Sequence, residues 1–166
     1  MSGRGELAGK VLFIAGVGPQ MGAATARIAV REGASVALAA RSSETCEELA
    51  RELCGQGARA IAIACDLTDR ASIAAAVERT EAELGQIDCV FYNAGYYDNN
   101  HDSVHVDEQI WQTTMDVNFN GALWLSQLTI PSMIERGGGS FLFNSSAASI
   151  VAGQVRFGYQ VSKAGV

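Results

Sequence analysis

Two titratable side chains near the end of the sequence are spaced so that they could act in one reaction. Tyr159 and Lys163 lie four residues apart in the segment YQVSK, and this spacing places them on the same face of a helix. A neighbouring cation favours the phenolate, so we expect the tyrosine pKa to move from about 10 towards the range of a general acid or base. Lys10 is the only other lysine, which argues against a chance pairing. An ordinary pair on a helix surface is the alternative.

Two polar residues upstream could assist a proton transfer at this tyrosine. Ser146 precedes Tyr159 by 13 residues and follows an apolar run of strand length. A hydroxyl at a strand end could hold a substrate carbonyl oxygen, as a pre-placed oxyanion donor does, and Ser145 is the competing candidate. Asn118 lies in an otherwise apolar helical segment, where an unpaired amide is costly to bury. This amide needs a partner, and a catalytic water is one candidate.

A glycine-rich segment near the amino terminus is typical of a phosphate-binding turn. The segment GVGPQMGA (16–23) follows a short apolar run and leads directly into an Ala-rich helical run. Glycines let the backbone turn tightly and let a pyrophosphate approach, and the N–H groups at the helix start attract its charge. No Gly-Lys-Ser/Thr follows, so a P-loop is excluded. A plain strand-to-helix turn is the alternative. The predicted phosphate contacts are Gly16, Gly18, Gln20, Met21 and Gly22.

The end of the second apolar run bears on the choice of dinucleotide. In dinucleotide-binding folds, the residue that reads the adenosine ribose lies at this position. An NAD site would have a carboxylate here, whereas this chain has Ala40 and Arg41. The small residue leaves room for a 2′-phosphate and the guanidinium can pair with it, which favours NADP over NAD. A solvated loop arginine is the other interpretation.

Two further strand ends carry candidate cofactor contacts. The carboxylate of Asp66 could accept a hydrogen bond from an adenine amine, but a Thr-Asp pair follows Leu67, so a helix cap is the alternative. After the fourth apolar run, small residues would let the backbone come close to a ligand, although the segment alone would be an ordinary turn. These residues are Asn93, Ala94 and Gly95.

Alternating strands and helices must position all of these residues. Parallel strands that are buried on both faces need crossovers of about a dozen residues, so the pattern predicts a doubly wound, three-layer α/β/α Rossmann fold. In such folds, ligands bind beyond the carboxyl ends of the strands. We expect strands at 11–15, 35–40, 60–65, 89–92 and 140–143. We expect helices at 20–32, from a cap at Ser43 to Gly55, at 69–84, at 107–134 as one long and bent helix, and from 158 onward.

Composition limits the class of protein. The chain has 166 residues with a net charge of −6, which suits a single domain over residues 1–166. Without a Lys/Arg cluster, nucleic acid is not an expected partner. Without an apolar run of about 20 residues, neither is a membrane. Charges in the first ten residues argue against a leader peptide, so a cytoplasmic location is expected. The cysteines are expected to be reduced and mostly buried: Cys46, Cys54, Cys65 and Cys89.

The polar loop at 96–106 offers two weaker candidates. His101 and His105 could be a metal pair, but no third ligand is evident nearby, so we expect no metal site. Aromatic residues at this loop could touch a substrate, and packing is the alternative for them. They are Tyr96, Tyr97 and Trp111.

Taken together, these motifs resemble the short-chain dehydrogenase/reductase family, in the branch with a Tyr-x-x-x-Lys active site. The resemblance implies an NAD(P)-dependent oxidoreductase, with NADPH favoured, that transfers hydride between the nicotinamide and a carbonyl or secondary alcohol carbon. It implies a small-molecule substrate and a homo-oligomer. The resemblance covers the glycine-rich turn, Asp66-Leu67, Asn93-Ala94-Gly95, the Asn118 helix, Ser146, Tyr159 and Lys163, in family order.

Roles for four residues follow from the resemblance. Tyr159 would donate or accept the proton, and Ser146 would orient the substrate oxygen. Lys163 would bind the nicotinamide ribose and lower the tyrosine pKa, while Asn118 would support a water relay. The turn has Gln20 where the family has glycine, so its geometry or cofactor affinity is expected to differ.

The family also continues through two more strands and a substrate-covering segment. We therefore expect a domain that is incomplete at its carboxyl terminus, with an open apolar edge at 141–143. Substrate identity is not readable from the sequence, because the segment that mostly sets it lies beyond Val166. A truncated dinucleotide-binding or subunit-interaction module without turnover is the alternative function. Enoyl reduction is disfavoured, because that branch spaces its Tyr and Lys more widely.

Overall fold

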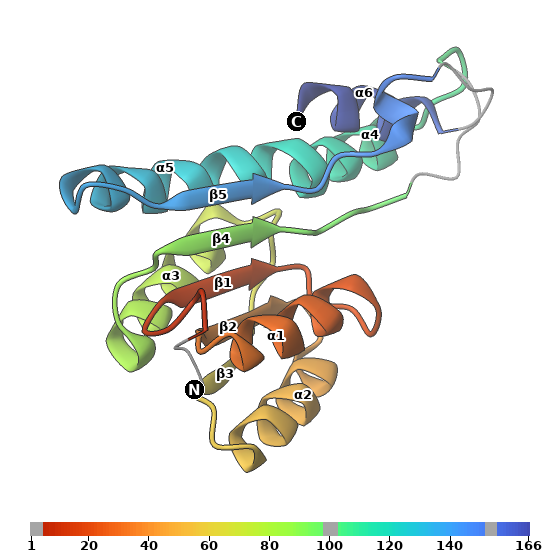
Figure 1. Cartoon of the computed structure of the whole chain (residues 1–166). Helices are drawn as coiled ribbons and strands as arrows, with labels where there is room; N and C mark the ends of the chain where they lie inside the picture. Colours follow the sequence, from red (N-terminus) through yellow and green to blue (C-terminus); the bar gives the residue numbers. More distant parts are fainter. Residues whose placement is uncertain (1–4, 98–102, 152–155) are drawn as a thin grey trace.

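A five-stranded parallel sheet forms the centre of the protein (Figure 1). The computed structural model describes residues 5–97, 103–151 and 156–166. The strands are β1 (Val11–Ala15), β2 (Ser35–Ala40), β3 (Ala60–Ala64), β4 (Cys89–Tyr92) and β5 (Ser140–Phe143). Their order is β3-β2-β1-β4-β5, so the predicted strands are confirmed within one residue.

The strand order reverses beside β1. Ile14 is in register with Leu38 of β2 on one side and with Phe91 of β4 on the other. The chain therefore builds outward through β2 and β3, and then returns to the opposite side of β1. Such a reversal leaves a crevice at the carboxyl ends of the central strands, which is where the candidate site must lie.

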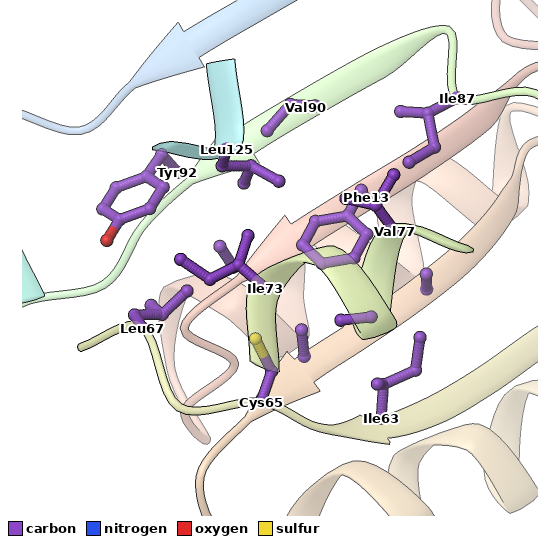
Figure 2. Packing of buried hydrophobic residues seen from close by; sticks show 14 of the residues in the cluster. Phe13, Ile63, Cys65, Leu67, Ile73, Val77, Ile87, Val90, Tyr92 and Leu125 are labelled. Carbon is purple, nitrogen blue, oxygen red and sulfur yellow. The ribbon is translucent and has the colours of Figure 1, made fainter. Parts of the chain in front are cut away.

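Helices cover both faces of the sheet and give the predicted three layers. On one face, α1 (Met21–Arg31) and α2 (Ser43–Gly55) pack against Leu12, Ile14 and Leu38. The other face carries α3 (Arg70–Leu84) and α5 (Gly121–Glu135), which pack against Phe13. Figure 2 shows this second cluster, with Ile73 and Val77 of α3 beside Phe13, and Leu125 of α5 near Val90 and Tyr92.

The predicted long helix contains a local change of pitch. It begins as α4 (Glu108–Met115), continues as the π-helical turn η1 (Asp116–Asn120) and ends as α5. At the junction the N–H of Gly121 donates to the carbonyl of Asp116, five residues earlier. The phenol of Tyr92 donates to the Val117 carbonyl at 2.6 Å. A β-carbon on Gly121 would lie 2.5 Å from the Tyr92 oxygen, so only glycine fits here.

Several predicted helix ends are displaced by one or two residues. Ser43 is the first residue of α2 rather than its cap, which is Ser42, and Ser42 makes no side-chain capping bond. Gly55 is still helical, and Gly57 adopts the positive φ of 87° that ends the helix. The last helix, α6 (Phe157–Gly165), begins one residue before the predicted start.

The outer edge of β5 is exposed, as the sequence predicted. Leu142 is 59% exposed, and Phe143 is also exposed. Within the described ranges, no helix is long and apolar enough to cross a bilayer. The cysteines are free, and two of them, Cys46 and Cys65, are buried.

Candidate functional site

A cleft of 860 Å³ lies at the carboxyl ends of the strands. Its lining comes from the glycine-rich turn after β1 and from the segments that follow β2, β3, β4 and β5. The structure thus brings together eleven of the predicted cofactor contacts, which are far apart in the sequence. They are Gly16, Gly18, Gln20, Met21, Gly22, Arg41, Asp66, Leu67, Asn93, Ala94 and Gly95.

The glycine-rich turn has the geometry that a phosphate group needs. Gly16 has a φ of 87°, and a β-carbon there would lie 2.5 Å from the Cα of Ala94. Among the residues described, the N–H groups of Gln20 and Met21 donate to no carbonyl or side chain. These free donors at the start of α1 suit the negative charge of a pyrophosphate. The turn therefore stays open to a phosphate group, although Gln20 stands where the family has glycine.

The adenosine end of the cleft carries an exposed cation and a constrained carboxylate. Asp66 accepts hydrogen bonds from the backbone N–H of Thr68 at 2.9 Å and from its hydroxyl at 2.8 Å. These bonds, with a smaller contribution from Arg41, lower the pKa of Asp66. The cap of α3 is Asp69, whose carboxylate accepts from the Ala71 N–H. Asp66 is therefore not the helix cap, and it stays available as an adenine contact.

An amide bridge joins three strand ends across the floor of the cleft. The side-chain amide of Asn93 donates to the carbonyl of Gly16 at 2.8 Å, and its oxygen accepts from the Asn144 amide at 3.0 Å. The bridge fixes the segments that follow β1, β4 and β5 relative to one another. Asn144 was not among the predicted site residues, and nothing in the sequence spacing signalled this contact.

Lys163 is buried beside this bridge. Its side chain is only 3% exposed, and its ammonium donates to the carbonyls of Asn144 at 2.8 Å and Ala94 at 3.0 Å. Burial lowers the pKa of Lys163. The carbonyl of Lys163 itself accepts from the Ser145 hydroxyl at 2.7 Å. Ser145 therefore braces the turn of α6 that carries the lysine.

Tyr159 lies on the same face of α6 and is 8% exposed. Its ring stacks on Tyr97, with the two ring centroids 4.6 Å apart. Burial raises the pKa of Tyr159, and the hydroxyl of Ser146 opposes this shift. The expected lowering by Lys163 is not found, because the ammonium donates to two carbonyls instead. At neutral pH the phenol therefore keeps its proton.

The two candidate serines have different environments. The Ser146 hydroxyl lies beside the Tyr159 phenol and accepts from the Ala148 N–H at 3.1 Å, at the start of a 3-10 turn (Ala147–Ser149). Because its hydrogen bond lowers the pKa of Tyr159, the Ser146 hydroxyl is the donor in that pair. The Ser145 hydroxyl is used by Lys163. This geometry favours Ser146 as the group that meets a substrate oxygen.

Asn118 has protein partners for its amide. The side chain is 0% exposed, accepts from the Tyr96 N–H at 2.6 Å, and donates to the Tyr96 carbonyl at 2.9 Å. It also donates to the Ser162 hydroxyl at 2.9 Å, which in turn donates to the Tyr159 carbonyl. The amide thus ties the loop after β4 to α6 through the π-helical turn. A bound water is not needed to satisfy it.

Two further aromatic contacts involve residues outside the predicted site. The guanidinium of Arg156 lies over the Tyr97 ring, 4.9 Å from its centroid, and Trp111 stacks on Phe157 at 5.8 Å. The sequence singled out Tyr97 and Trp111 only as loop aromatics and gave no signal for Arg156. His101 lies outside the described residues. Across the described part of the chain, no three metal-ligating side chains cluster.

Comparisons with known proteins agree with this geometry. The profile of a family described as short chain dehydrogenase matches residues 10–166. D-threitol dehydrogenase of Mycolicibacterium smegmatis is 33% identical over 161 residues, which are 97% of this chain and 62% of that protein. A 3-oxoacyl-(acyl-carrier-protein) reductase of Thermotoga maritima is 32% identical over 163 residues, covering 97% of this chain and 65% of that protein.

A solved structure extends the likeness to three dimensions. A 7α-hydroxysteroid dehydrogenase complexed with NADH and 7-oxo glycochenodeoxycholic acid superposes with a TM-score of 0.90 at 27% identity, over 95% of this chain and 61% of that one. The chain therefore spans less than two thirds of the length of these relatives. Because the family profile covers nearly all of the sequence, the chain belongs to the short-chain dehydrogenase/reductase family.

Proposed function

We propose that the chain carries the dinucleotide site and the proton-transfer site of an NADPH-favouring oxidoreductase that interconverts carbonyl compounds and secondary alcohols. The observation that carries the proposal is a cluster beside the cleft, in contact with Tyr97 and Ala94 of its lining. There the Tyr159 phenol lies beside the Ser146 hydroxyl, and Lys163 is buried one turn of helix away. These are a proton donor, a donor for the substrate oxygen, and a cation.

The residues of the cleft fit a nicotinamide dinucleotide. The free N–H groups of Gln20 and Met21 would hold its pyrophosphate, and Asp66 would accept from its adenine. An ammonium has three N–H donors, and Lys163 uses two of them on carbonyls, so one remains for a cofactor ribose hydroxyl. When bound, the cofactor supplies or accepts the hydride.

The proton chemistry falls to Tyr159. Because burial raises its pKa, the phenol is protonated at neutral pH and is ready to donate to a carbonyl oxygen that Ser146 holds by a hydrogen bond. Protonation of that oxygen completes the alcohol. In this state the phenol can act as the general acid of carbonyl reduction. Asn118 holds α6 in place through Ser162 and so positions Tyr159.

NADPH is the favoured cofactor because the end of β2 carries Ala40 and Arg41 rather than a carboxylate. We expect Arg41→Gln to weaken NADPH binding by about 10- to 100-fold, which is the usual worth of a charged hydrogen bond, and to leave NADH binding unchanged. Arg51→Gln removes an exposed arginine on α2 and serves as the control. Equal loss of NADH and NADPH binding in the Arg41 variant would contradict the 2′-phosphate role.

Location and assembly belong to the same proposal. A small-molecule carbonyl or alcohol substrate and a cytoplasmic setting fit the composition, with its net charge of −6. Homo-oligomerisation through the helices that follow β4 and β5 is supported by exposed apolar side chains on α5, such as Leu123 and Ile134. Sedimentation of the chain, and of a Leu123→Glu/Ile134→Glu variant, tests this: the variant should be monomeric where the parent is not.

The decisive experiment is a fluorescence titration with NADPH and NADH, followed by a carbonyl-panel assay. Loss of the Tyr159 proton donor in Tyr159→Phe should reduce turnover by about 10²- to 10⁴-fold, while NADPH still binds. Binding of NADPH without carbonyl-dependent oxidation would support the alternative, a dinucleotide-binding module without turnover. No binding of either cofactor would reject the proposal for this chain.

A further inference from the structure

Arg156 is the residue next to the site whose placement the proposed reaction leaves unexplained. It precedes α6 and adopts φ 66° and ψ 60°, and it is the only non-glycine residue with positive φ among those that the structure describes. A side chain in this conformation is strained, and such strain collects at functional sites. Glycine would fit the backbone here without strain, so the arginine is held at a cost.

The strained backbone places the guanidinium above the site. Its Cζ lies 4.9 Å from the centroid of the Tyr97 ring, and that ring stacks on Tyr159 at an interplanar angle of 25°. Tyr97 also lines the cleft. A charge in this position acts on the catalytic phenol, since Arg156 lowers the pKa of Tyr159 against the effect of burial. The three side chains form one stack, with Tyr97 in contact with both others.

No carboxylate neutralises this cation in the described ranges. Arg27 meets Glu52 at 2.6 Å and Arg79 meets Glu83 at 2.7 Å, whereas Arg156 has no ion pair with any residue described there. An arginine that has no ion pair among the described residues is available to an anion from solution. The proposed partners of the cofactor phosphates lie elsewhere, in the glycine-rich turn after β1 and at Arg41 after β2. Arg156 lies over Tyr97, which follows β4.

We propose that Arg156, supported on the face of Tyr97, binds a carboxylate of the substrate, so that the preferred substrates are oxo acids whose carbonyl oxygen meets Tyr159. This inference rests on the proposed oxidoreductase function and names its substrate class. A guanidinium is planar and presents paired N–H groups that match the two oxygens of a carboxylate, and it stacks well on an aromatic ring. The phenol and the guanidinium thus recognise the two ends of one molecule.

The chain offers its own reporter for the test. Trp111 stacks on Phe157, which directly follows Arg156 in the sequence, so its fluorescence should respond to a ligand at the guanidinium. Trp124→Phe removes the only other tryptophan. In that background, 4-oxopentanoate and its methyl ester are titrated in the presence of NADPH. The two ligands have the same carbonyl and differ by one negative charge.

We expect the acid to bind about 10- to 100-fold more tightly than the ester, as a charged hydrogen bond requires. Arg156→Gln should abolish the difference, and Arg156→Lys should retain part of it. Arg156→Gly separates folding from binding, because it relieves the positive-φ strain and should raise the melting temperature while losing the preference for the acid. Arg51→Gln, the same change at an exposed position on α2, should keep the preference.

Turnover with the same two ligands separates this inference from the function on which it rests. Arg156-dependent binding of the acid without NADPH oxidation supports the carboxylate site and rejects the proposed reaction for this chain. Reduction of both ligands with equal kcat/KM overturns the inference and leaves the reaction intact. Absence of binding by either ligand, or a preference that survives in Arg156→Gly, also overturns it.

Discussion

Asn118→Ala is the substitution that tests most directly how the site is held in place. The amide is fully buried and makes three hydrogen bonds, two to the Tyr96 backbone and one to Ser162. Truncation to alanine removes the hydrogen bonds to the Tyr96 backbone and to the Ser162 hydroxyl, and it opens a small cavity. A buried group that loses its partner costs about 1 to 3 kcal/mol, and water can reach Tyr96 in part because that residue is half-buried. We therefore expect a loss of about 3 to 5 kcal/mol in unfolding free energy.

Asn120 is a matched control two residues away. It lies in the same π-helical turn and donates one amide hydrogen bond to Asp116 at 2.7 Å, at a half-buried position. Asn120→Ala should therefore cost about 1 kcal/mol or less. Urea unfolding measured with a common slope gives both values. If Asn118→Ala costs no more than Asn120→Ala, then the amide does not hold the loop and α6 together, and its role in positioning Tyr159 is refuted.

Three further outcomes follow from the described contacts. Tyr92→Phe removes the bond to the Val117 carbonyl and should lower the unfolding free energy by about 1 to 2 kcal/mol; no change in urea unfolding would mean that the π-helical turn does not need it. Gly16→Ala places a β-carbon against Ala94 at a positive φ, so NADPH binding should be lost in a fluorescence titration. Gly18→Ala should retain folding, because its β-carbon meets open space. Burial lowers the pKa of Lys163. Between that lowered pKa and about 10.4, the unfolded chain therefore binds more protons than the folded chain, and the unfolding free energy should rise with pH. Lys163→Met should flatten this rise when unfolding is measured as a function of pH.

Much of the fold was predictable because its signals are local. Each strand of the sheet is a short apolar run between helical segments, and the glycine-rich turn sits where β1 must lead into α1. The helix ends were less accurate, since Ser42 and Ser43 are both plausible caps and only the backbone decides between them. The change of pitch at 116–120 has no local signature. It depends on the Tyr92 phenol and on close packing at Gly121.

The sequence indicated which residues of the candidate site lie near one another but not which contacts they make. Motif spacing singled out Tyr159, Lys163 and Ser146, and the fold places them close together beside the cleft. The partners of Asn118 come from positions 96 and 162, and no spacing rule links these to it. The pKa of Tyr159 moved opposite to expectation, because four-residue spacing says that two groups are neighbours but not what else they contact. Two backbone carbonyls attract the lysine away from the phenol.

The π-helical turn also has a meaning in terms of insertions and deletions. A turn with five-residue hydrogen bonding contains one residue more than an α-helix needs over the same rise. Deleting one residue within 116–120 would remove that extra residue and leave α4 and α5 as one regular α-helix, with the buried face of α5 kept. Leu125 would then stay in the core, where it is fully buried. A one-residue deletion elsewhere in α5 has no such turn to absorb it and would rotate the residues beyond it by about 100°, so the π-helical turn should be the place in this helix where a single-residue deletion is best tolerated.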